Sequence, residues 1–186
     1  MPDSVIADTV NNFQALIDLR QTFKPFKYDL TEFEKTLRRC EDRGLYTESA
    51  SHLYMGQWRM TDNLKHGRGT WLRNYKDGDG DLYEGYFKDG KREGTGRMFY
   101  YDGSTFEGEW QADTWNGHGA LYFKNGNKYA GNFINGVMEG NGSMIYPNGT
   151  KYLGLWKANK KHGHGTVYDE TGNVTEEGQW EEGTKK

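Results

Sequence analysis

A five-element pattern recurs along the sequence with a period of 23 residues. Each copy has an aromatic–x–Gly–x–aromatic run, a Gly-x-Gly seven residues later, and another seven residues on, a glycine in a turn setting. The four regular copies begin at Tyr83, Phe106, Tyr129 and Tyr152, and an earlier copy with six inserted residues begins at Tyr54. A sixth copy opens near Trp180 and stops early. Self-similarity at such a period predicts an array of repeats in which each repeat packs on its neighbours.

The pattern inside each copy predicts β-strands. With two-residue alternation, the aromatics and glycine of a run share one face, and the residues between them share the other. Asn-Gly and Asp-Gly pairs between alternating runs, such as Asn125-Gly126 and Asn148-Gly149, predict two-residue type I′ hairpin turns. We therefore expect an elongated, single-layer antiparallel meander with two strands per repeat, about 50 Å long at ~4.8 Å per strand.

Glycines and aromatics at interlocking positions predict how the meander packs. Glycine leaves room for a flat ring to lie across the neighbouring backbone, so rings and glycines of successive hairpins should interlock. The glycines expected to be structural are Gly85, Gly94, Gly96, Gly108, Gly117, Gly119, Gly131, Gly140, Gly142, Gly154, Gly163 and Gly165.

Composition divides the chain into three parts. Of the 26 glycines only Gly44 precedes Tyr54, and all six tryptophans follow it. We expect a helical segment over residues 1–44, a connector over 45–53 and the repeat ribbon over 54–183. Leu, Ile, Val and Phe make up about 16% of the chain, which disfavours a large aliphatic core.

The N-terminal segment carries an apolar stripe at helical spacing. The stripe predicts a helix over about residues 4–22 and consists of Ile6, Val10, Phe13, Leu16 and Ile17. A second helix is expected from Asp29 to about Gly44, with Phe33, Leu37 and Cys40 on one face. Short isolated helices are marginal in water, so the stripe must be buried. We expect it to pack on the aromatic face of the early repeats, with a partner protein as the alternative.

These motifs resemble the MORN repeat over roughly residues 54–183. The resemblance implies a scaffold for protein–protein interaction, because MORN-repeat proteins occur in ciliary radial spokes, in other cytoskeletal assemblies and as cargo or motor adaptors. It also implies a cytoplasmic location, at the cytoskeleton, cilium or axoneme. Related repeats in junctophilins and plant phosphoinositide kinases have been proposed to bind lipid, which gives the alternative of a peripheral phospholipid-associating module.

Aromatic and apolar side chains of the repeats are the candidate binding residues. Trp115 and Met138 fall in expected connectors, where an apolar side chain either meets a partner or folds back over its own sheet. The full set is Tyr83, Phe87, Phe106, Trp110, Trp115, Tyr129, Phe133, Met138, Tyr152 and Trp156.

Charge and motif content exclude several other functions. A pI near 6.0 disfavours nucleic-acid binding, and no apolar run reaches the roughly 18 residues of a membrane-spanning helix. Residues 54–186 carry 17 Lys and Arg against 18 Asp and Glu, so nothing draws them as a whole to anionic lipid. The one local basic cluster is Lys157, Lys160, Lys161, Lys185 and Lys186. No constellation of nucleophile and base or of metal ligands appears, so we expect no enzyme activity, cofactor or metal.

Overall fold

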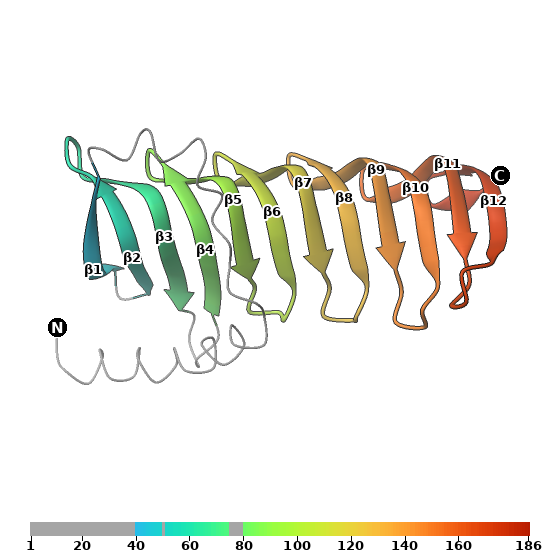
Figure 1. The fold of residues 1–186 in the computed structure, drawn as a ribbon, viewed down its shortest axis with the longest axis horizontal. Coiled ribbons are helices and arrows are strands. Elements are labelled where there is room, and N and C mark those ends of the chain that lie inside the picture. The colour runs from blue at the N-terminus through green and yellow to red at the C-terminus, as the bar shows by residue number, and fades with distance from the viewer. Residues whose placement is uncertain (1–39, 50, 75–79) are drawn as a thin grey trace. The chain divides into compact units, whose positions relative to one another are not determined.

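The computed structural model describes residues 40–49, 51–74 and 80–186. The chain divides into two compact units, one ending at Tyr101 and the other running from Asp102 to Lys186. The described part of each unit is an antiparallel meander whose strands lie side by side in chain order (Figure 1). No helix occurs among the described residues. The antiparallel meander predicted from the repeat is confirmed, and the predicted helix over 4–22 lies outside the described residues.

The described part of the first unit contains five strands. They are β1 (Cys40–Ser49), β2 (His52–Arg59), β3 (Leu64–Asn74), β4 (Gly80–Lys88) and β5 (Lys91–Phe99). Each strand pairs with the next in antiparallel register.

The second unit contains eight strands. They are β6 (Thr105–Gln111), β7 (Thr114–Tyr122), β8 (Lys128–Ile134), β9 (Val137–Ile145), β10 (Lys151–Lys157), β11 (Lys160–Tyr168), β12 (Val174–Glu181) and β13 (Thr184–Lys185). The register places glycine opposite glycine in neighbouring strands, as with Gly131 and Gly142. Asn135 and Gly136, at φ 51° and 81°, form a two-residue turn between β8 and β9, as expected for the left-handed conformations of a type I′ hairpin.

One face of each sheet, here called the ring face, carries the leading and closing aromatics of the repeats. Tyr129 is 1% exposed, and its ring lies over the Gly131–Gly142 pair of its own hairpin. A methyl group placed on Gly131 would lie 2.5 Å from Tyr129 Oη and 2.6 Å from Gly142 Cα. The predicted interlocking of rings and glycines is therefore present, with each leading ring seated on the glycines of its own repeat.

The rings form an edge-to-face series along the ring face. In the second unit Tyr129 meets Phe133 of its own repeat and Trp156 of the next, each at 5.2 Å between ring centroids. Tyr152 likewise meets Trp156 and Trp180 at 5.4 Å. Edge-to-face pairs contribute about 0.5–1.5 kcal/mol each beyond area burial. Aromatic rings thus supply the core that the scarce aliphatic residues cannot.

The Tyr hydroxyls have a backbone partner. Tyr129 Oη donates to the carbonyl oxygen of Asn132 at 3.1 Å. The same bond, to the carbonyl three residues on, is made by Tyr54, Tyr83 and Tyr152. The Phe106 ring lies over Gly108 and Gly119 in the same way, but it carries no hydroxyl group.

Residues 40–53 differ from the prediction. Cys40, Arg43 and Gly44 do not end a helix: they lie in β1, which pairs with β2 across the expected connector. Tyr46 meets the Trp58 ring edge-to-face at 5.1 Å, and the Arg43 guanidinium lies 5.5 Å from the Trp58 ring centre. Trp58 needs a neighbouring strand to cover it, and this need for packing overrides the local helix signals.

Candidate interaction surfaces

Most of the aromatic candidates predicted to bind partners lie in the interior of the ring face. Nine of the ten are at most 7% exposed: Tyr83, Phe87, Phe106, Trp110, Tyr129, Phe133, Met138, Tyr152 and Trp156. They contact one another and the repeat glycines. Their position assigns them to the core, so a surface for partners must be sought elsewhere.

Trp115 and Met138 lie on strands rather than in connectors. Trp115 is in β7, where its ring stacks on Phe106 at 4.5 Å with 11° between planes. It also meets Phe133 at 5.6 Å. Met138 is in β9 and is 7% exposed. Contact with a partner and packing over the chain's own sheet were the two alternatives for these side chains. The structure shows the second.

Trp115 and Met138 belong to a column that covers the leading rings. This column lies two residues before each Gly-x-Gly and contains Lys65, Arg92, Trp115, Met138 and Lys161. Lys65 Nζ lies 5.6 Å from the Tyr54 ring centre, and the Arg92 guanidinium carbon 5.8 Å from that of Tyr83. A cation over a ring stabilises the pair by roughly 0.5–2 kcal/mol. The column therefore closes the core with either a cation or an apolar group.

Lys161 lies among three aromatic rings. Its Nζ is 4.5 Å from the ring centre of Trp180, 4.7 Å from that of Tyr152 and 5.5 Å from that of Tyr146. Burial lowers the pKa of Lys161, an effect that nearby Glu176 partly offsets. The ammonium group fills this three-ring cage, so its chemistry is that of a structural cation.

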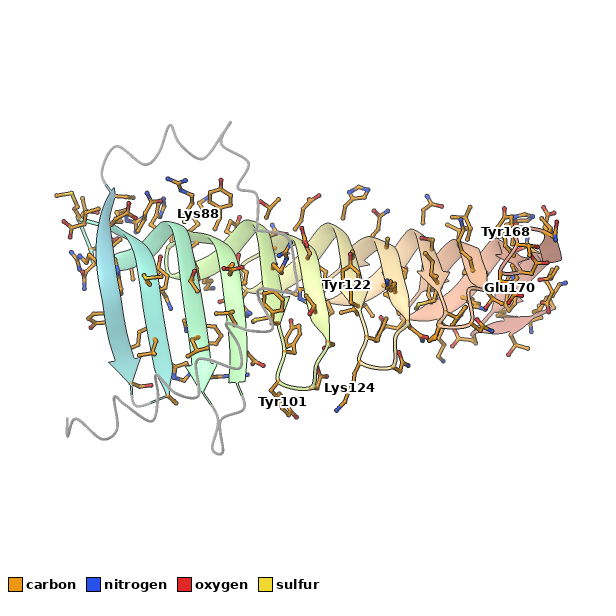
Figure 2. The ribbon with its side chains drawn as sticks, turned by 60° about the horizontal axis from the view of Figure 1, so that its bottom comes forward. Lys88, Tyr101, Tyr122, Lys124, Tyr168 and Glu170 are labelled. Atoms are coloured by element: carbon orange, nitrogen blue, oxygen red, sulfur yellow. The ribbon has the colours of Figure 1, made fainter. Side chains whose placement is uncertain are left out.

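The opposite side of the sheet, here called the back face, has a different character in the second unit. A cross-strand row runs through Tyr122, Lys128, Ile145, Lys151 and Tyr168 in continuous register (Figure 2 labels Tyr122 and Tyr168). Lys128 Nζ lies 6.0 Å from the Tyr122 ring centre, and Lys151 Nζ 5.4 Å from that of Tyr168. Each of the two lysine ammonium groups thus lies near a tyrosine ring, and Ile145 lies between the two lysines.

Exposed apolar side chains lie in this row and beside it. Ile145 is 43% exposed, Leu153 47% and Leu155 38%, although all three lie within strands. Among the strand residues of β7 to β11, Glu139 is the one acidic side chain. Its Oε2 accepts a hydrogen bond from Ala158 N at 2.9 Å. This back-face patch, made of the cross-strand row with Leu153 and Leu155, is basic and apolar.

Sequence reasoning missed the back-face patch because it followed the repeat. The patch residues stand between or beside the repeated aromatics and glycines, at positions that vary from copy to copy. A useful signal was present: Lys128 and Lys151 both precede a leading tyrosine, and Leu153 and Leu155 alternate with Gly154. Two apolar residues on the face away from the rings are unusual in a strand with one solvated side.

The predicted basic cluster is largely neutralised within the second unit. Lys160 pairs with Glu182 and Lys186 with Glu181, each at 2.6 Å, and Lys185 lies 4.0 Å from Glu176. Lys161 is held in its cage. The cluster is therefore a poor attractor for anionic lipid.

Titratable groups do not gather into a metal site. Within residues 40–49, 51–74 and 80–186, no group of three or more His, Cys, Asp or Glu side chains is placed to hold an ion. His118 and His164 are exposed and lie 3.7 Å from Glu109 and 3.5 Å from Glu177. His66 is 7% exposed, and its burial lowers its pKa.

A hollow beside Trp115 is a second feature of the second unit's surface. It is lined by Asp102, Ser104, Trp115, Leu121, Phe123, Lys124 and Asn125. The Asp102 carboxylate accepts hydrogen bonds from Ser104 N at 2.8 Å and Ser104 Oγ at 2.6 Å, and these bonds lower its pKa. The aspartate is thus occupied in forming the turn.

These features define a class of protein: a β-meander of hairpin repeats with an aromatic core on one face of the sheet. The sequence profile of the MORN repeat matches residues 54–80, 83–105, 106–128, 129–151 and 152–174, and the chain belongs to the MORN-repeat family. MORN repeats are modules for interaction with proteins or membrane lipids. A comparison with curated protein sequences gave no significant match. In the part of the chain that the structure describes, no helix has the length and apolarity to cross a membrane.

Proposed function

We propose that this chain is a structural or adaptor protein without enzyme activity, and that the back-face patch of its second unit binds other proteins. The observation that carries the proposal is an exposed apolar surface with two lysines in register and almost no carboxylates on its strands. Exposed apolar patches rimmed by polar groups mark interaction sites. The complementary partner is an acidic segment with apolar side chains.

Membership of the MORN-repeat family supports a cytoskeletal or ciliary setting for this function. MORN-repeat proteins act in ciliary radial spokes and other cytoskeletal assemblies, so the partner proposed here is a cytoskeletal or ciliary component. The rigid register of the strands supports an adaptor role, because it holds Lys128 and Lys151 on either side of Ile145. Charges fixed in this way favour orientation and selectivity of docking.

Peripheral lipid binding is the second candidate. The lysines and tyrosines of the back-face patch could approach anionic headgroups, but the other basic cluster is paired with carboxylates. The second unit also carries more acidic than basic side chains, which would repel an anionic bilayer. These charges favour a protein partner.

A charge-reversal pull-down tests the proposal. The Lys128→Glu/Lys151→Glu double variant should lose partners captured from a cell extract by the wild-type chain. A control with the same charge change, Lys88→Glu/Lys91→Glu, alters two exposed lysines of the first unit and should retain them. Wild-type binding to phosphatidylserine vesicles, lost in the first variant, would instead indicate a membrane. Equal capture of the same cytoskeletal proteins by both variants would exclude this patch as the docking surface.

A further inference from the structure

The first unit buries both faces of its sheet, unlike the second. In β4 every residue from Gly80 to Phe87 is buried, whereas in β8 and β10 burial alternates along the strand. Alternating burial is expected of a sheet with one solvated face, and burial on both sides of a strand requires cover on both. Paired strands alone cannot supply the second cover.

One cross-strand row on the buried back face of the first unit is apolar, and next to it on the same face Glu84 is buried opposite Arg97. Leu53, Leu72, Leu82 and Phe99 stand in cross-strand register on β2–β5 and form one hydrophobic cluster. They are 7%, 2%, 2% and 0% exposed, and Tyr86 on the same face of β4 is 3% exposed. The corresponding row of the second unit contains Lys128, Ile145 and Lys151, and its Ile145 is 43% exposed. The two units thus differ both in the residues of this row and in their burial.

We propose that the N-terminal segment, residues 1–39, covers this apolar row, with its predicted helical stripe packed on β2–β5. The burial is found in the chain by itself, without a second copy or partner. The segment leads directly into Cys40 of β1, which pairs with β2, the strand that carries Leu53. The occupant is therefore already tethered to the face it covers.

The dimensions of the stripe and the row agree. From Leu53 to Phe99 the row crosses three strand spacings, about 14 Å at ~4.8 Å each. In a helix, the eleven steps from Ile6 to Ile17 span about 17 Å at ~1.5 Å per residue. The 22 residues between Ile17 and Cys40 reach about 33 Å even in helical form, which is enough to return the chain to β1.

The proposal changes the face on which the segment was expected to dock. The sequence favoured the aromatic ring face, but there Tyr54 and Tyr83 already fill the space above their glycines and are 0% exposed. The apolar row on the back face consists of three leucines and Phe99. The N-terminal segment becomes a second layer for the first unit, and the second unit keeps its back face for the partner.

Hydroxyl-radical footprinting of the full chain tests this cover, because it reports side-chain accessibility directly. The Ile6→Asp/Val10→Asp/Phe13→Asp variant removes the stripe, and Ser4→Asp/Asn11→Asp/Ala15→Asp places the same charges on the opposite side of the predicted helix. Oxidation of Leu72, Leu82 and Phe99 should be low in the wild type and the control and should rise several-fold in the stripe variant. Tyr83 should stay protected throughout, which shows that the ring face is still folded.

A photo-cross-link tests the same cover without the stripe variant, which is needed if that variant fails to fold. Benzoylphenylalanine in place of Phe13 should cross-link within the same chain to residues 52–74 or 80–99. Cross-links between two copies, or wild-type protection of the row that disappears on dilution, would assign the cover to a second molecule and overturn the proposal. Wild-type oxidation of the row as strong as that of Ile145 would also overturn it.

Discussion

Replacing Gly131 with alanine separates packing from strand propensity. Alanine normally improves a strand position relative to glycine by roughly 0.5–1 kcal/mol, because it restricts the unfolded chain. At Gly131 the φ angle is not positive, so no backbone strain confuses the comparison. The added methyl, however, would lie 2.5 Å from Tyr129 Oη, 2.6 Å from Asn141 O and 2.6 Å from Gly142 Cα.

The size of the effect follows from what must move. Two of the three close atoms belong to the backbone of β9, which is held in register with β8, so the sheet cannot yield cheaply. Overpacking of this kind costs about 1–3 kcal/mol. Displacing the Tyr129 ring also weakens its contacts with Phe133 and Trp156, at about 0.5–1.5 kcal/mol each. We expect Gly131→Ala to destabilise the chain by about 3 kcal/mol.

Urea denaturation followed by circular dichroism measures the change. Gly44→Ala is the matched control, since Gly44 also lies in a strand but a methyl there meets nothing within 4 Å. The control should unfold within about 0.5 kcal/mol of the wild type. A Gly131→Ala variant as stable as Gly44→Ala would refute the seating of the leading rings on their glycines.

Three further predictions concern the rings and two titratable groups. Tyr129→Phe should lose about 1 kcal/mol through the hydrogen bond to Asn132 O, while Phe106→Tyr should not destabilise; urea midpoints compare them. Because the pKa of Lys161 is lowered in the folded state, this state binds the proton less tightly than the unfolded state. The free energy of unfolding should therefore rise as the pH increases toward 10.5. In alkaline melting curves, the Lys161→Met variant should lack that rise. Hydrogen bonds from Thr171 and Asn173 lower the pKa of Asp169 to about 2, so its stabilising contribution should be lost as pH falls from about 4 to about 2; an Asp169→Asn variant whose acid melting curve matched the wild type would contradict this.

The back-face patch and the proposed N-terminal cover give the back faces of the two units different roles. In the first unit the apolar row Leu53, Leu72, Leu82 and Phe99 is buried, and under the proposal above it is occupied by the chain itself. In the second unit the equivalent row exposes Ile145 between two lysines. Under the two proposals, one repeat type serves both for packing within the chain and for binding a partner, according to the side chains on the face away from the rings.

The 23-residue period determined most of the fold. Alternation determined which residues share a face, and Asp89-Gly90 and Asn135-Gly136 form the predicted two-residue turns, so the antiparallel meander and its glycine-to-glycine pairing followed from local rules. The prediction of two-residue turns at Asn125-Gly126 and Asn148-Gly149 was wrong: these pairs lie in five-residue loops, where only the glycine has a positive φ. These rules succeed because strand period and turn geometry depend on neighbouring residues.

Only the tertiary structure decided which of those faces is covered and by what. The leading rings proved to be core because they sit on glycines across a strand pair, and Trp115 proved to stack on Phe106. Residues 40–49 became β1 because Trp58 needed a neighbour, a requirement that no local helix signal records. Alternation tells two faces apart, but the free energy of covering a face comes from contacts between residues distant in sequence.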